Sequence, residues 1–348
     1  MSLPREALEQ TTDWLEDLLR QGLSREDVTR PAFWHEQAAR LTDAKYPGLA
    51  RRLRRLCIWP PGDMSWAPVM LIELGRLHLL IQAALQFAEL PAEVQNELTV
   101  SLRPAPKRET LIGRTPSVED AWLVIGRRIS MEPLAPQQRM RVAETWLLGR
   151  EGGRLGLHVG FSPERSSREK TPDESTPAPL VQPLGGLLAS TPPGTPAHFI
   201  SSLCPQRLLF REPPPFTAPK EAPSMDSLPW AASFAEVSQS LLANLEQLPW
   251  LEQHPFLLKG VMPLPEQVAR VAGCFRLETP FPAARWVADG EGNCSPVSPL
   301  LSEDAWWRWL AQAQQYGPSR LFGVLDPAPY VLPYSIWSEG ETGMRSLL

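Results

Sequence analysis

The hydrophobic repeat of this chain changes between residues 102 and 117, and this change constrains the fold more than any other feature. Over residues 4–102 apolar side chains such as Leu15, Leu18 and Leu19 recur about every three or four positions, which predicts amphipathic helices. Beyond residue 116 apolar and polar residues alternate, as is typical of an antiparallel sheet with one solvated face. The sequence therefore predicts an α+β fold: an N-terminal helical bundle, an antiparallel β-sheet, and a second, smaller α+β unit.

The helical region is predicted to contain four or five helices. Pro31 fits the first position of one helix, and Pro91 starts the last. In residues 49–56 the leucines share one stripe, and the arginines project from the opposite side. This segment is therefore expected to bury one face and to expose a basic one.

Three segments, 122–125, 140–148 and 155–161, are predicted to form the strands of an antiparallel meander, with Gly152 and Gly153 in a tight turn. Residues 162–182 are rich in Ser, Thr, Pro, Glu and Lys, so we expect a flexible, dispensable insertion there. The apolar pieces 184–188 and 198–210 are expected to return to the same sheet.

The C-terminal unit is predicted to start with a helix that carries Phe234 and Val237. Strands are expected at 256–261, 268–277, 286–287 and, as the last one, 321–325, with a polar loop at 289–293. Ser302 is a good cap for a further helix. The expected domains are a helical region (1–116), a β region (117–215), a proline-rich linker (216–227) and the C-terminal unit (228–348).

The composition is typical of a soluble protein with sizeable hydrophobic cores. The 348 residues are 43% hydrophobic and carry a net charge of −5, and they include 39 prolines and 13 tryptophans. Charged residues interrupt the longest apolar stretch, 69–88, so it predicts a core helix and not a membrane span. The four cysteines lack close spacing, and no signal peptide is expected, so free thiols and a cytoplasmic location are predicted.

The sequence contains no complete motif for catalysis or metal binding. His35-Glu36 lacks the second histidine of a zincin, because Ala39 holds its place. The glycines of 149–156 lie between two strands and lack the spacing that binds a pyrophosphate, and no P-loop or nucleophile elbow is present. No cofactor is expected. A cryptic hydrolase would need His158 or His198 close to Cys204 or to a carboxylate.

Two sets of residues are candidates for binding. Four arginines of the helical region could contact the phosphates of a nucleic acid, although a solvated helix face is the simpler explanation: Arg51, Arg52, Arg54 and Arg55. Four aromatic residues could anchor a protein partner: Trp14, Phe33, Trp34 and Trp307. The alternative for the first three is burial against the helix predicted at 69–88. For Trp307 the alternative is a position at the rim of the domain junction.

The stretch 32–44, with Phe33-Trp34-His35-Glu36, and the segment 48–56 resemble the region that follows the zinc finger in bacterial SWIM zinc-finger family proteins. Looser matches extend through 118–128, 141–149, 193–209 and 244–261. The finger's Cys-x-Cys and Cys-x-His pairs are missing, so no zinc is expected. The chain begins where the finger would end, which suggests a stand-alone subunit, a split gene product or a fragment.

Genes of this family lie beside those of AAA-type ATPases and von Willebrand A-type proteins, and the resemblance therefore implies a multiprotein assembly. A finger supplied by another protein would dock against residues 13–56. The sequence thus predicts a non-enzymatic interaction or scaffold protein of the bacterial cytoplasm. A nucleic-acid-binding module that uses Arg51 to Arg55 is the first alternative, and a cryptic hydrolase is the second.

Overall fold

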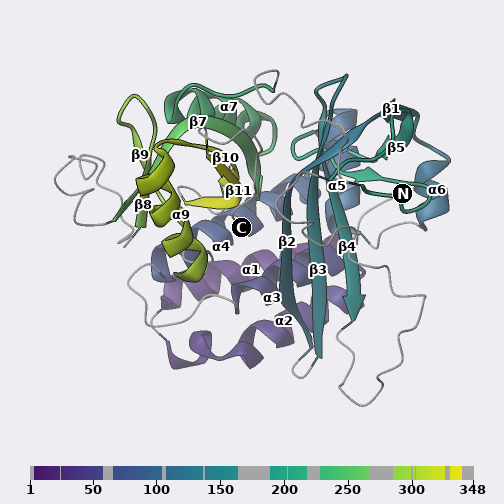
Figure 1. Ribbon diagram of the computed structural model, residues 1–348. Helices are drawn as coiled ribbons and strands as arrows, with labels where there is room; N and C mark the ends of the chain where they lie inside the picture. Colours follow the sequence, from purple (N-terminus) through teal and green to yellow (C-terminus); the bar gives the residue numbers. More distant parts are fainter. Residues whose placement is uncertain are drawn as a thin grey trace, which may run out of the picture.

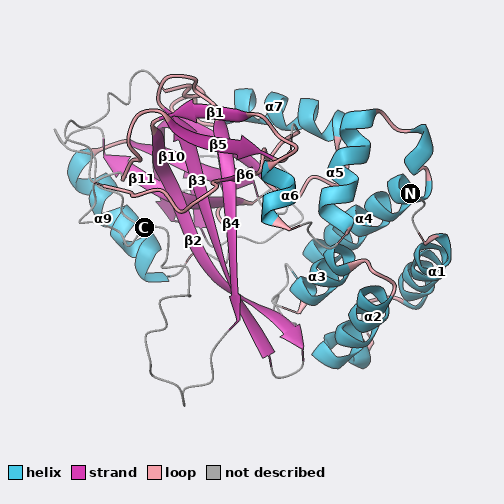
Figure 2. Ribbon diagram, turned by 90° about the vertical axis from the view of Figure 1, so that its right-hand side faces the viewer, coloured by secondary structure: helices cyan, strands magenta, loops and turns pink. Residues whose placement is uncertain are grey.

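The computed structural model describes residues 4–23, 25–57, 66–103, 107–135, 138–163, 189–201, 203–217, 228–265, 285–298, 301, 303–325 and 330–338. The helical region lies along one side of the molecule, and the three sheets lie on the other (Figures 1 and 2). The α+β class, with a helical bundle preceding antiparallel sheets, is confirmed.

The helical region is built from α1 (Arg5–Gln21), α2 (Pro31–Asp43), α3 (Pro47–Leu56), α4 (Trp66–Leu85), α5 (Ala92–Leu102) and the short α6 (Arg108–Ile112). Two 3-10 turns, Glu26–Thr29 and Phe87–Glu89, join them. Pro31 occupies the first turn of α2, and Pro91 precedes α5, as predicted. The stripe predicted on α3 is also confirmed, because its three leucines are buried in the helical core.

Helix α4 is long and apolar enough to cross a membrane by length and composition alone. Its residues Leu74, Leu77 and Ile81 are nonetheless buried in the same core as α1, α2 and α3. α4 therefore packs as the core helix that the sequence predicts.

The meander is also confirmed: β2 (Trp122–Ala135), β3 (Gln138–Gly149) and β4 (Leu155–Pro163) pair antiparallel in this order. The turn between β3 and β4 contains Gly153, whose φ is +64°. These three strands are long, and their far half extends past the other sheets (Figure 2). Most of the insertion predicted at 162–182 lies outside the described residues.

The segment 198–210 does not join the meander, and this prediction is wrong. Instead β1 (Ser117–Asp120), β5 (Thr195–Phe199) and β6 (Leu208–Leu209) form a separate sheet. Within the described residues, one isolated bridge, Leu157 with Arg207, pairs the backbone of this segment with β4. Prolines on both sides of β5, at 192, 193 and 205, lack the amide donors that a longer ladder needs.

The C-terminal unit is a five-stranded sheet in the order β11-β10-β7-β8-β9, flanked by α7 (Phe234–Gln247) and α9 (Glu303–Tyr316). Its strands are β7 (His254–Pro265), β8 (Arg285–Ala288), β9 (Cys294–Pro296), β10 (Ser319–Leu325) and β11 (Val331–Ser338). The strand predicted as the last is followed by β11, which the sequence analysis missed. Ser302 and the strand predicted at 268–277 lie outside the described part of the chain.

The three regions share their cores. Leu248, Trp250 and Leu251, which follow α7, are buried in the core of the helical region. Leu123 and Trp146 of the meander are buried together with Phe322 and other side chains of the C-terminal sheet. Each region thus uses apolar side chains from another to complete its interior.

Cys57 and Cys204 are free, as predicted, whereas Cys294 is disulfide-bonded, so the prediction of a free thiol is wrong there. Sequence spacing does not reveal a bridge between cysteines that only the fold brings together.

Candidate functional site

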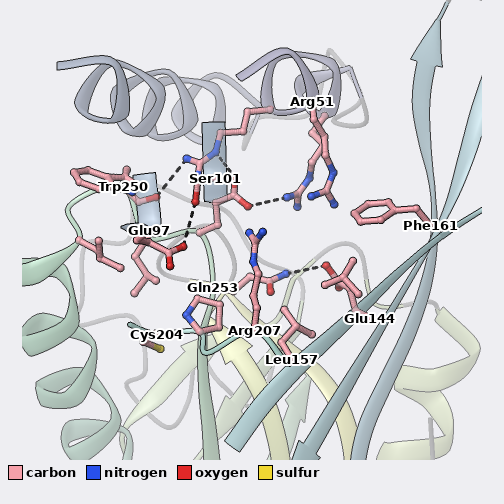
Figure 3. A pocket seen from close by; sticks show the side chains of 17 residues that line it. Arg51, Glu97, Ser101, Glu144, Leu157, Phe161, Cys204, Arg207, Trp250 and Gln253 are labelled. Carbon is pink, nitrogen blue, oxygen red and sulfur yellow. Dashed lines mark hydrogen bonds and ion pairs between the residues drawn. The ribbon is translucent and has the colours of Figure 1, made fainter. Parts of the chain in front are cut away.

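A cavity of about 70 Å³ lies where the helical region, the meander and the C-terminal unit meet (Figure 3). Helices α3 and α5 line one side, β3 and β4 another, and two loops, at 204–207 and 248–253, close it. The charged residues of its wall are Arg51, Arg52, Arg55, Arg207, Glu97, Glu144 and Glu252.

Three of the four arginines predicted to contact nucleic acid point into the wall of this cavity and form ion pairs there. Arg51 binds Glu132 of β2 through Nε at 2.7 Å and Nη2 at 2.9 Å. Arg52 Nε and Arg55 Nη1 both contact Glu252, at 2.6 and 3.2 Å. The expectation of a solvated basic face on α3 is therefore wrong, because β2 and the loop after α7 cover that face.

Glu252 is the centre of this network. Burial opposes its ionisation, but the positive charges of Arg52 and Arg55 outweigh that effect and lower the pKa of the carboxyl to about 2. Glu252 therefore stays ionised at every pH at which the protein is expected to work.

Arg54, the fourth arginine, points away from this network. Its Nη2 donates to the Thr42 hydroxyl at 3.0 Å, and burial lowers its pKa. Arg54 therefore joins α3 to α2 and contributes nothing to the cavity wall.

Glu97 and Glu144 accept hydrogen bonds from uncharged groups. The hydroxyls of Ser101 and Ser201 donate to Glu97. Glu144 accepts from the Tyr334 hydroxyl at 2.6 Å and from Gln253 Nε2 at 3.4 Å. These two carboxylates are thus held by neutral donors from α5, β11 and the loops.

Arg207, like Glu97, Glu144 and Glu252, is a residue of the site that the sequence analysis missed. Its guanidinium extends from the loop after Pro205 into the middle of the cavity (Figure 3). Within the described ranges it has no hydrogen-bond or ion-pair partner, although its charge contributes to lowering the pKa of Glu252. No spacing in the sequence marks Arg207, because it is the fold that brings this loop against α3.

A second feature is the outer face of the projecting meander, formed by the exposed Ile129, Met131 and Arg139 and the partly buried Arg127 and Arg141. Cross-strand register places these residues on the face opposite to Glu132 and Glu144, which contact the helical region and the C-terminal sheet. Ile129 is 44% and Met131 37% exposed. Burial, followed by repulsion from Arg141, lowers the pKa of Arg127.

The aromatic candidates divide into two groups. Trp34 is buried, and its Nε1 donates to the Val28 carbonyl at 2.8 Å, so the prediction that it anchors a partner is wrong. Trp14 and Phe33 pack against Trp34 and are partly buried in the helical core. Trp307 is 59% exposed on α9, whereas Trp306 and Trp309 are buried, as the helical pattern predicts.

The two histidines required for a hydrolase lie against backbone carbonyls. His158 Nδ1 faces Leu208 O at 3.2 Å, and His198 Nδ1 faces Thr115 O at 3.1 Å. Burial and the charge of Glu97 raise the pKa of Cys204 to about 12, which keeps it a thiol. Among the described residues, no group of three or more His, Cys, Asp or Glu side chains is placed to hold a metal ion.

Comparisons with known proteins relate one part of the chain to a family. No curated protein and no solved structure matches. Residues 5–102 match a family model described as the SWIM-associated four-helix bundle domain. This range coincides with α1 to α5. Arg51, Arg52 and Arg55 of the cavity wall lie on α3. The helical region of this chain is therefore similar to the SWIM-associated four-helix bundle domain, and this similarity relates residues 5–102 to SWIM family proteins.

Proposed function

We propose that the protein is a non-enzymatic interaction or scaffold protein that joins a multiprotein assembly through the outer face of its meander. One observation carries this proposal: Ile129 and Met131 are exposed between arginines on a part of the sheet that extends away from the rest of the molecule (Figure 2). Apolar anchors surrounded by arginine are typical of protein interfaces.

The charges of this face favour an acidic protein segment as the partner. In the part of the chain that the structure describes, Arg127, Arg139 and Arg141 form no ion pair. A carboxylate bound between Arg127 and Arg141 would relieve their mutual repulsion. Ile129 and Met131 would at the same time bury apolar side chains of the partner.

The arginines of the same face could bind the phosphates of a nucleic acid, but Ile129 and Met131 at its centre cannot form ion pairs with them. The arginines of α3 are also poorly suited to that role, because Arg51, Arg52 and Arg55 would first have to leave Glu132 and Glu252. We therefore propose a protein partner. By the resemblance to SWIM family proteins, an AAA-type ATPase and a von Willebrand A-type protein are the first candidates.

A photo-crosslinking amino acid at position 129 tests this proposal in cells that express the full chain. The matched control carries it at position 242, because Leu242 on α7 is also apolar and is more exposed than Ile129, at 61% against 44%. The protein captured from position 129 is then purified and titrated with the wild-type chain and with Arg141→Glu. We expect a binding partner with an acidic segment, whose affinity falls about tenfold or more with Arg141→Glu because a favourable charge contact becomes repulsive.

Capture at both positions alike, or equal affinity for the wild-type chain and Arg141→Glu, would contradict the proposal. A duplex or single-stranded DNA titration forms the second arm. Submicromolar DNA binding that weakens about tenfold or more between roughly 50 and 200 mM salt would favour the nucleic-acid alternative instead.

A further inference from the structure

Among the described residues that line the cavity of Figure 3, the Arg207 guanidinium has no hydrogen-bond or ion-pair partner. Arg51, Arg52 and Arg55 are held by two carboxylates, Glu132 and Glu252. The Arg207 guanidinium enters the same space and, within the described residues, meets no acceptor. A guanidinium has five N–H donors, and leaving them unused beside a buried network is unfavourable unless a ligand or water accepts them.

The backbone holds Arg207 firmly in this place. The amide of Leu157 in β4 donates to the Gln206 carbonyl at 2.8 Å, and the amide of Ile200 donates to the Arg207 carbonyl, also at 2.8 Å. The loop that carries Arg207 is thus fixed to two different sheets. The guanidinium is therefore presented to the cavity by a rigid element and not by a free surface loop.

The charges around the cavity are balanced in number but separated in space. Four arginines face four carboxylates, Glu97, Glu132, Glu144 and Glu252. Ser101 and Ser201 hold Glu97, and Tyr334 and Gln253 hold Glu144, so neither carboxylate pairs with Arg207. Of these four arginines, Arg207 is the one without a carboxylate partner among the described residues, so the negative charge of a ligand would lie there. Glu97 and Glu144 would repel a doubly charged group more strongly than a singly charged one.

The rest of the cavity wall is largely apolar, so it favours a ligand that carries an apolar group beside its charged one. Leu157, Val159 and Phe161 lie in sequence along the inner face of β4, and Phe161 is half exposed. Arg51 also stacks over the Phe161 ring, 5.2 Å from its centroid. A cavity of about 70 Å³ holds roughly five water-sized groups, enough for the head of a small organic acid.

We propose that this cavity binds a small organic monocarboxylate, whose carboxylate pairs with Arg207 and whose apolar part lies along Leu157, Val159 and Phe161. A planar carboxylate matches the fork of donors on a guanidinium. This site is separate from the outer face of the meander and is independent of the partner proposed there, because Val159 and Phe161 lie on the opposite face of the sheet.

Isothermal titration of the full chain with butyrate tests this site, with butyramide as the uncharged analogue and inorganic phosphate as the alternative anion. We expect butyrate to bind and butyramide to bind about tenfold or more weakly, because only butyrate forms a charge-assisted pair. Arg207→Gln should weaken butyrate binding by a similar factor. Arg211→Gln, at an exposed arginine nearby in the sequence, should leave it unchanged.

A second variant keeps the test decisive if Arg207→Gln fails to fold. Phe161→Ala removes only a half-exposed ring and should weaken butyrate binding without unfolding the protein. The proposal is overturned if butyrate and butyramide bind equally, or if Arg207→Gln, once shown to be folded, binds butyrate like the wild type. Binding of phosphate without binding of butyrate would overturn the choice of a carboxylate.

Discussion

Glu252 links the stability of this protein to pH. Its carboxylate contacts Arg52 and Arg55, and its pKa is about 2, below the ordinary value of 4.5. A carboxyl whose pKa is lower in the folded state stabilises that state above the unfolded pKa, and this contribution is lost as the pH falls through the folded pKa. The free energy of unfolding should therefore decrease between pH 4.5 and 2.

Glu252→Gln tests this linkage in urea unfolding at a series of pH values. At pH 7 we expect a loss of about 3 kcal/mol, because Arg52 and Arg55 keep their charges without the carboxylate. Between pH 4.5 and 2 the variant should lose less stability than the wild type. Parallel pH profiles of the two proteins would show that Glu252 does not carry the acid sensitivity.

Trp34 is expected to be essential for folding and not for partner binding. It is buried, it donates to Val28 O, and it packs edge-to-face against Trp14 and Phe33. Trp34→Ala should lower the free energy of unfolding by roughly 3–5 kcal/mol. The control is Trp307→Ala on α9, at an exposed ring, which should change it by no more than about 0.5 kcal/mol. Similar denaturation midpoints for the two variants would contradict this assignment.

At the scale of elements, Gly48 allows α3 and α5 to cross closely. A Cβ at this position would lie 1.8 Å from the Ser101 carbonyl oxygen, which belongs to the backbone of α5 and cannot move without displacing the helix. Gly48→Ala should therefore destabilise the protein by about 1–3 kcal/mol or more, as overpacking of a core does.

Gly75 provides the matched control, because it also lies within a helix, α4, and a Cβ there would meet no atom within 4 Å. Gly75→Ala should raise the melting temperature, since alanine favours a helix by about 1 kcal/mol over glycine. The two alanine variants should thus shift the midpoint of thermal unfolding in opposite directions. A shift of the same sign in both would contradict the close crossing.

The elements with a long, regular pattern could be predicted from the sequence, and the short or shared ones could not. α3, α7, α9 and the meander follow from their periodicity. The sheet of β1, β5 and β6 was missed, because strands as short as Leu208–Leu209 have no detectable alternation. The pattern of α3 correctly showed which face is polar, but it could not show that Glu132 and Glu252 cover this face.

The residues of the candidate site could not be grouped from the sequence for a related reason. Its wall combines residues from α3, α5, β3, β4 and two loops, and Arg51 and Arg207 are far apart along the chain. Local periodicity indicates that Arg51, Arg52 and Arg55 share one face of a helix, and it predicts that this face is exposed to solvent. Only the tertiary arrangement shows that these three are paired and that Arg207 has no ion-pair partner within the described part of the chain.

For the whole molecule, the shared cores predict cooperative unfolding. Leu248, Trp250 and Leu251 lie in the core of the helical region, and the meander shares a core with the C-terminal sheet. Far-ultraviolet circular dichroism and tryptophan fluorescence should therefore report one common transition. Trp250→Ala should lower that common midpoint while the transition stays single. Two separate transitions in the wild type would show that the regions unfold independently.

The position of Trp250 also has a consequence for the order in which this protein is synthesised. Helices α1 to α5 have been synthesised once translation passes Leu102, but Leu248, Trp250 and Leu251, which complete their core, follow almost 150 residues later. At about 5–20 residues per second, the nascent bundle waits roughly 7–30 s with an unfilled apolar surface. We therefore expect the nascent helical region to expose apolar surface that chaperones can bind, and slow translation between codons 102 and 248 to lengthen that exposure.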